Sequence, residues 1–164
     1  MFEVRELDLM KPGELEEALA LVGKVFDEFE APTYPSQGVE NFHNSIHIEP
    51  MRERYSQEQA RMWLAFGNET IIGVIALRNI NHICLFFVDS AYHRQGVGKA
   101  LYQAARNYLR SIKSEFVTVY SSPYAVGIYE RLGFACVSEE LLIENMYCSP
   151  MCAYIAHGEK FRTD

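Results

Sequence analysis

The chain has 164 residues, of which 49% are hydrophobic and 23% are charged. These values predict a single domain over residues 1–164, with a core large enough to fold without a metal or disulfide framework. The net charge of −7 offers no basic face to neutralise phosphates, so we do not expect nucleic-acid binding.

Membrane and metal association are also not expected from the sequence. No stretch approaches the roughly 18 consecutive apolar residues that a membrane helix needs, and the acidic, alternating N-terminal segment is unlike a signal peptide. Cys84, Cys136, Cys148 and Cys152 show no paired CxxC spacing. We therefore expect a cytoplasmic protein with reduced thiols and no metal site.

The first 60 residues predict one strand followed by helices. An apolar face from Leu15 to Phe26 favours a helix, and Pro12 and Gly13 stand where such a helix would begin. In chain order we expect a strand over 2–7, this helix, a breaker-rich loop over 31–38, a short helix over roughly 39–48, and a charged stretch over 49–60 that fits helix or loop.

The rest of the chain predicts a sheet interrupted by two helices. Apolar positions between Gly96 and Arg110 recur at helical spacing, and Gly133 is placed to end a second, shorter helix. We expect strands over 61–67, 71–78 and 82–89, a helix over 96–110, a strand over 115–121, a helix over 124–132 and two closing strands near 134–139 and 141–156. This order predicts an α+β or mixed α/β fold with helices on both faces of the sheet.

The stretch 85–101 carries the clearest chemical signal, because a hydrophobic strand runs through a short loop and a Gly-x-Gly turn into a helix. Unpaired N–H groups at a helix N-terminus attract anions, and Gly96 and Gly98 leave room for a phosphate to approach them. On spacing alone, the glycines could equally serve only to ease the turn. A dinucleotide-binding GxGxxG motif is excluded because position 101 is leucine, and no Walker A sequence is present.

His93-Arg94-Gln95-Gly96-Val97-Gly98 resembles the cofactor motif of the GNAT N-acetyltransferases, with His93 where the family has Gln or Arg. The resemblance covers nearly the whole chain and is strongest over 71–136. It implies acetyl-CoA as cofactor and a mostly antiparallel, twisted sheet that is splayed between its fourth and fifth strands. It also implies a pantetheine arm that pairs with the fourth strand like an added strand. The cofactor-binding residues would be Phe86, Phe87, Val88, His93, Arg94, Gln95, Gly96, Val97, Gly98, Lys99 and Ser122.

A second segment, 122–134, is similar to the family's Asn-x-x-Ala-x-x-x-Tyr-x-x-x-Gly-Phe pattern. Ala125 and Tyr129 match it, while Ser122 stands where asparagine is usual. By this resemblance Tyr129 would protonate the departing thiolate. Without the resemblance, a tyrosine on a short amphipathic helix is more often part of the core.

The reaction also needs a base to take the proton of the acceptor amine. The resemblance points to His82, and histidine titrates near neutral pH. His82 could instead be a solvated residue at the start of a strand, and Glu40 or an amine already deprotonated in solution are alternatives. Direct attack in a ternary complex is expected, with an oxyanion held by the N–H of Val88. A nucleophilic Cys84 is the rival mechanism, although nothing beside it would lower its pKa.

The acceptor would be a small-molecule or protein amine, and the acidic chain modestly favours a cationic one. By resemblance, Tyr34 and Phe42 would contact it, with Phe29, His43, Tyr147 and Met151 as further candidates. His43 and His47 could also pair on a metal, but no third ligand is in view. A monomer or homodimer is expected. The alternative function is a noncatalytic CoA-binding sensor or interaction domain on the same fold.

Overall fold

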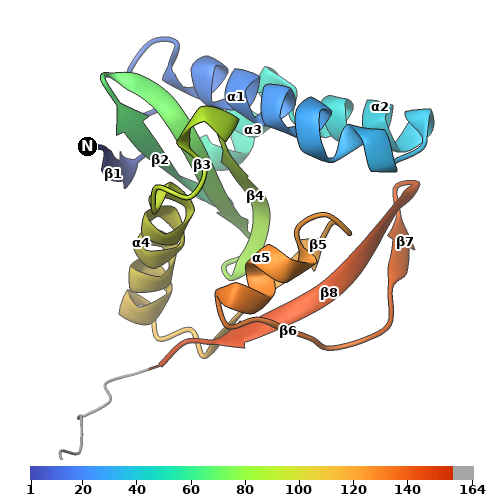
Figure 1. Ribbon diagram of the computed structural model, residues 1–164. Helices are drawn as coiled ribbons and strands as arrows, with labels where there is room; N and C mark the ends of the chain where they lie inside the picture. The colour runs from blue at the N-terminus through green and yellow to red at the C-terminus, as the bar shows by residue number, and fades with distance from the viewer. Residues whose placement is uncertain (157–164) are drawn as a thin grey trace, which may run out of the picture.

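The computed structural model describes residues 1–156 (Figure 1), so the last part of the predicted domain, 157–164, lies outside the described residues. Within 1–156, no helix combines the length and the apolar character needed to cross a membrane. The elements are β1 (Glu3–Glu6), α1 (Glu14–Phe29), α2 (Ser36–Ser45), α3 (Ile48–Ser56), β2 (Ala60–Gly67), β3 (Thr70–Arg78), β4 (His82–Val88), α4 (Val97–Ser111), β5 (Phe116–Ser121), α5 (Val126–Arg131), β6 (Ala135–Cys136), β7 (Leu141–Ile143) and β8 (Met146–Tyr154).

The strands form one sheet in the order β1-β2-β3-β4-β5-β8-β6, and β7 pairs with β8 at its side. Every pair is antiparallel except β4 and β5, which run parallel. The mixed fold and its mostly antiparallel sheet are therefore confirmed.

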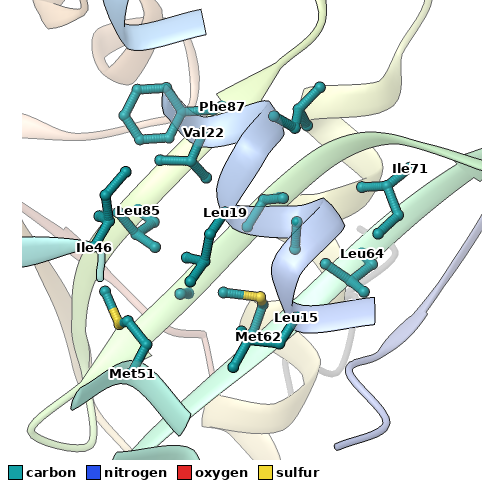
Figure 2. Close-up of a cluster of buried hydrophobic side chains, with 14 of the residues drawn as sticks. Leu15, Leu19, Val22, Ile46, Met51, Met62, Leu64, Ile71, Leu85 and Phe87 are labelled. Carbon is teal, nitrogen blue, oxygen red and sulfur yellow. The ribbon is translucent and has the colours of Figure 1, made fainter. Parts of the chain in front are cut away.

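Helices cover both faces of this sheet, as predicted (Figure 1). On one face, α1 to α3 pack on β2–β4, where Leu15, Leu19 and Val22 of α1 meet strand residues such as Leu64 and Leu85 (Figure 2). On the other face, α4 and α5 pack on a second cluster. The apolar stripe of each helix thus finds a sheet face to bury, which is the main source of its stability.

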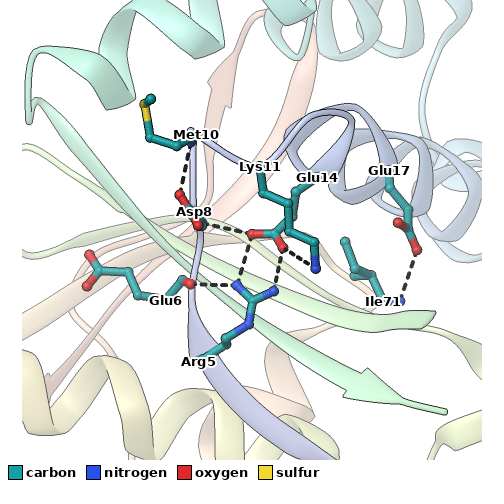
Figure 3. Close-up of polar contacts among 8 residues, drawn as sticks. All are labelled: Arg5, Glu6, Asp8, Met10, Lys11, Glu14, Glu17 and Ile71. Atoms are coloured by element: carbon teal, nitrogen blue, oxygen red, sulfur yellow. Dashed lines mark hydrogen bonds and ion pairs between the residues drawn. The ribbon is translucent and has the colours of Figure 1, made fainter. Parts of the chain in front are cut away.

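The start of α1 is tied to the sheet by a buried carboxylate, Glu14 (Figure 3). Its oxygens accept hydrogen bonds from the Arg5 guanidinium and from the N–H of Asp8, and Lys11 lies within ion-pair distance. The hydrogen bond from Arg5 holds the pKa of Glu14 below its ordinary value. One turn on, Glu17 accepts from the N–H of Ile71 on β3, so α1 is fixed at a set position over the sheet.

The region between α1 and β2 differs from the prediction. The short helix expected at 39–48 begins earlier, at Ser36, and the ambiguous stretch 49–60 is mostly a third helix, α3. Pro50 does not interrupt α3 because it lies in the first turn, where a missing N–H costs nothing. Gly38 allows α2 to touch the β7–β8 turn, since a Cβ there would lie 2.7 Å from the carbonyl oxygen of Asn145.

The closing strands also differ, because the single strand expected over 141–156 is a hairpin of β7 and β8. Glu144 and Asn145 form its turn with φ values of 50° and 61°. Two successive residues with positive φ match the twist of a two-residue hairpin. The strand expected at 134–139 is reduced to β6. The β7–β8 hairpin supplies one wall of the site described below.

The predicted splay between the fourth and fifth strands is present. Pairing of β4 with β5 is confined to His82 with Thr118 and Ile83 with Val119. Cys84 forms a bulge on β4, since Ile83 pairs with Leu77 and Leu85 with the next residue, Ala76. A bulge bends its strand and increases the local twist, so β4 leaves β5 directly after the last paired residue.

Candidate functional site

The loop between β4 and α4 is where the sequence predicts an anion cradle. Gly96 is the N-cap of α4, with a left-handed φ of 85°, and no side chain caps the helix. A Cβ at Gly96 would meet nothing within 4 Å, so its conformation, and not a lack of space, favours glycine. Arg94 and Lys99 line the same cavity, which has a volume of about 580 Å³. Free N–H groups, the positive end of the helix dipole and two cations together suit a pyrophosphate.

Most of the predicted cofactor-binding residues line this cavity, which we call the cofactor cavity. Two predicted members lie elsewhere. Gln95 donates to the carbonyl oxygen of Ala91, and Ser122 lines the neighbouring cavity instead. The predicted residues found in the cofactor cavity are Phe86, Phe87, Val88, His93, Arg94, Gly96, Val97, Gly98 and Lys99.

His93, the departure from the family motif, has a clear position. Its Nε2 lies 2.8 Å from the carbonyl oxygen of Val88, and its ring contacts that of Phe29 at 5.2 Å between centroids. His93 therefore braces the end of β4 against the cradle loop. The bond also occupies the carbonyl of Val88, which leaves the main chain before Val88 as the part of β4 open to an added strand.

A second cavity of about 270 Å³ lies beside the first, on the α1–α3 face of β4. We call it the acceptor cavity, and the predicted residues Tyr34, Phe42 and His82 all line it. The walls common to both cavities are Glu30, Phe86, Phe87, Ala125 and Tyr129.

Tyr129 lies on α5 at this junction. It is buried, its ring contacts those of Phe86 and Phe134, and it lines both cavities. Burial raises the pKa of its hydroxyl well above the ordinary value. The hydroxyl therefore stays protonated at neutral pH, as a hydrogen-bond donor must.

Glu30 is the site residue that sequence reasoning missed. It follows the last residue of α1, and its Oε1 accepts a hydrogen bond of 2.9 Å from the hydroxyl of Ser122. Burial raises its pKa, and the Ser122 hydrogen bond only partly offsets this. No cation pairs with Glu30 among residues 1–156. Glu30 lies four residues after Phe26 and eight after Val22, so it continues the buried stripe of α1. This spacing could have predicted from the sequence that the Glu30 side chain faces the sheet.

His82 and Cys84 both line the acceptor cavity. The Nδ1 of His82 lies 2.8 Å from the Thr118 hydroxyl. Burial, with the nearby charge of Arg78, lowers the pKa of His82 to about 4, so the ring is neutral at physiological pH. Burial raises the pKa of Cys84 to about 11, which keeps it as a thiol and makes it a poor nucleophile.

The remaining candidates lie away from the junction. Glu40 is exposed on α2 and lines neither cavity. Met151 is fully buried in the core, and Tyr147 is exposed on β8. His43 lies 2.7 Å from Asp27, and no group of three metal-ligating side chains occurs among the described residues. Phe29, the last of the predicted acceptor-contacting residues, lines the cofactor cavity and not the acceptor cavity.

Known proteins resemble this chain over most of its length. The N-acetyltransferase YafP of Escherichia coli K12, itself uncharacterised, is 28% identical over 131 residues, covering 79% of this chain and 81% of YafP. A GCN5-related N-acetyltransferase structure from Rhodopseudomonas palustris superposes with a TM-score of 0.78 at 16% identity, covering 93% of this chain and 94% of that one.

A third similar protein, the PaiA N-acetyltransferase of Thermoplasma acidophilum, was solved in complex with coenzyme A. It has a TM-score of 0.76 at 18% identity and covers 94% of this chain and 99% of its own. The family model named Acetyltransferase (GNAT) domain matches residues 30–154 of this chain. This match includes β2 to β8, both walls of the splay and the cradle loop. The chain therefore belongs to the GNAT acetyltransferase family.

Proposed function

We propose that this protein is an N-acetyltransferase that moves the acetyl group of acetyl-CoA to a primary amine by direct attack in a ternary complex. The observation that carries this proposal is the junction of the two cavities. The cofactor cavity, with its anion cradle, opens beside a smaller cavity, and Glu30 and Tyr129 line both. A donor and an acceptor bound in the two cavities would meet between a carboxylate and a hydroxyl.

The cofactor cavity suits acetyl-CoA through the positive charge of its lining and the unpaired stretch of β4 beside it. The N–H groups at the start of α4, with Arg94 and Lys99, would hold the pyrophosphate. The main chain of β4 that β5 leaves unpaired would bind the pantetheine arm. Acetyl-CoA, when bound, supplies a thioester that an amine can attack. The residues 86 and 87, which line both cavities, would hold its reactive end at the junction.

Tyr129 would act on the leaving sulfur. A hydroxyl whose pKa is raised by burial donates a hydrogen bond, but full transfer to a thiolate with an ordinary pKa of about 8.5 is uphill. We therefore infer that Tyr129 stabilises the departing thiolate mainly as a hydrogen-bond donor.

Glu30 would take the proton of the amine. A base works best when its pKa is near the working pH, and burial shifts the pKa of Glu30 upward, toward neutrality. The pKa of His82 is shifted the opposite way, to about 4, which makes it a weaker base. Its Nδ1 is also engaged by Thr118. We propose Glu30 as the base in preference to His82.

Thermal unfolding with and without ligands tests the cofactor site. At about 100 times its Kd, a ligand that binds only the folded state stabilises it by about 2.7 kcal/mol, or roughly 5–10 °C in Tm for a chain of this size. We expect this shift with acetyl-CoA and with CoA, and none with NAD. No shift in Tm at millimolar acetyl-CoA would reject the proposed acetyltransferase function. A shift without turnover of any amine would favour the noncatalytic CoA-binding sensor.

The variant Tyr129→Phe removes one hydroxyl and keeps the ring that packs on Phe86 and Phe134. We expect turnover to fall by about 10–1000-fold, the order of magnitude for losing one proton-donating group. The CoA affinity, measured by calorimetry, should be unchanged. The matched variant Tyr154→Phe alters an exposed tyrosine of β8 that lines neither cavity and should keep its turnover. Full activity in Tyr129→Phe would remove this residue from the mechanism.

A further inference from the structure

Two arginines line the acceptor cavity: Arg78 at the end of β3, which pairs with His82 at the start of β4, and Arg54 of α3. Both residues are exposed to solvent. Neither guanidinium forms an ion pair or a side-chain hydrogen bond within residues 1–156. By contrast, Arg52, two residues before Arg54, is paired with Glu16.

The two arginines reach the cavity from α3 and from the end of β3, and Cys84, at the bulge of β4, lines it as well. The positive charges of Arg78 and Arg54 both act against the rise in the pKa of the Cys84 thiol that burial causes. Cys84 itself donates to the carbonyl oxygen of Ala76 at 3.5 Å.

A buried hydroxyl of the same cavity lacks a partner. Tyr55 follows Arg54 on α3, is 7% exposed and lines the acceptor cavity, and its Oη has no hydrogen-bond partner among the described residues. Buried polar atoms in proteins are nearly always hydrogen-bonded. A ligand oxygen in this cavity would supply the acceptor that Tyr55 lacks.

The charge that a ligand must balance depends on the other ionisable groups that line the acceptor cavity. His82 is neutral at physiological pH because burial lowers its pKa to about 4. Glu144, at the β7–β8 turn, has its carbonyl oxygen bound by Asn41 of α2. Two guanidinium groups and the Glu144 carboxylate leave one net positive charge, which a singly charged anion balances. Glu30 stands apart from these groups, at the junction.

The two ends of the cavity are well separated along β4. His82 pairs with Arg78, whereas Phe86 lies at the junction with the cofactor cavity. Four residues of strand span at most about 13 Å between backbone positions, and the bulge at Cys84 shortens this span. An elongated acceptor therefore fits the two sets of groups better than an α-amino acid, which holds its amine and its carboxylate on a single carbon.

We propose that the acceptor is an elongated amine with a carboxylate at its far end, and that Arg54 and Arg78 bind this carboxylate while the amine meets Glu30. The inference rests on the proposed acetyltransferase function and narrows its substrate class. Guanidinium groups suit it because their forked donors match the two oxygens of a carboxylate.

The test compares ω-amino carboxylates, from 4-aminobutanoate to 8-aminooctanoate, with their own amides, with glycine and with 1,6-diaminohexane. We expect kcat/KM for the best carboxylate to exceed that of its amide by about 10–100-fold, as charge-assisted hydrogen bonds suggest. In the double variant Arg54→Gln/Arg78→Gln this ratio should fall to about threefold or less, through a higher KM for the carboxylate. Arg52→Gln removes the same charge from α3 outside the cavity and should keep the ratio.

A binding measurement covers the case in which turnover is too slow to compare. The same acceptors are titrated calorimetrically into protein saturated with CoA, and the carboxylate should bind about 10–100-fold more tightly than its amide. Equal binding of the amide, or tighter binding of the diamine, would overturn the proposal while leaving the acetyltransferase function intact. Failure of acetyl-CoA itself to bind would instead reject the proposed function.

Discussion

Gly96→Glu is expected to weaken CoA binding at least about 100-fold, which corresponds to about 2.7 kcal/mol. Gly96 is the N-cap of α4, and its position lines the cofactor cavity. A glutamate there would place a negative charge where the free N–H groups of the helix would hold phosphates. The favourable field of the helix N-terminus would then be used by the protein's own carboxylate. Calorimetric titration with CoA measures the loss.

The chain contains a closely matched control for the backbone part of this change. Gly13 is the N-cap of α1, with φ 80° against 85° at Gly96, and a Cβ at either position would meet nothing within 4 Å. Gly13→Glu therefore has the same left-handed strain, about 1–2 kcal/mol, but lies outside both cavities. We expect both variants to lose similar thermal stability and only Gly96→Glu to lose CoA binding. Equal CoA affinity in the two variants would show that the loop is only a turn.

The cofactor side of the site could be predicted from the sequence because its signals are local. A strand, two glycines and a helix start all lie within 85–101, so one continuous stretch indicates both the candidate cradle and its place on the sheet. The family resemblance adds Tyr129 from a second local motif, and the structure places it at the junction of the two cavities. The splay of β4 from β5 was expected from the resemblance and is visible in how few residues pair the two strands.

The acceptor side could be predicted only in part, as Tyr34, Phe42 and His82, since its walls come from α1, α2, α3, β2, β3, β4, β5, α5, β7 and β8. No short motif encodes a cavity assembled from so many elements. The hairpin itself was missed because 141–156 is apolar enough for one strand. Its only turn signal, Glu144-Asn145, contains no glycine. Arg54 lay in the stretch whose helical state was ambiguous, and Arg78 looked like an ordinary strand end.

Glu30→Gln is expected to lower turnover by about 10²–10⁴-fold, the usual contribution of a general base. The amide keeps nearly the same shape and can still accept the hydrogen bond from Ser122, so the fold and the CoA affinity should be retained. Glu28→Gln makes the same change at a neighbouring exposed residue of α1 that lines neither cavity, and it should keep its turnover. His82→Gln is the competing variant, and we expect it to be far less impaired than Glu30→Gln.

The pH profile separates a base from a purely structural carboxylate. Burial raises the pKa of Glu30, and only its deprotonated form can take a proton, so kcat/KM should fall as pH decreases through that raised pKa. In Glu30→Gln this fall of kcat/KM at low pH, the acidic limb of the profile, should disappear, and only the pH dependence caused by ionisation of the amine substrate should remain. If Glu30 only positioned Ser122, the variant would lose activity by a constant factor and keep the limb. If His82 were the base, the limb would lie near pH 4, the pKa of His82, and would disappear in His82→Gln instead.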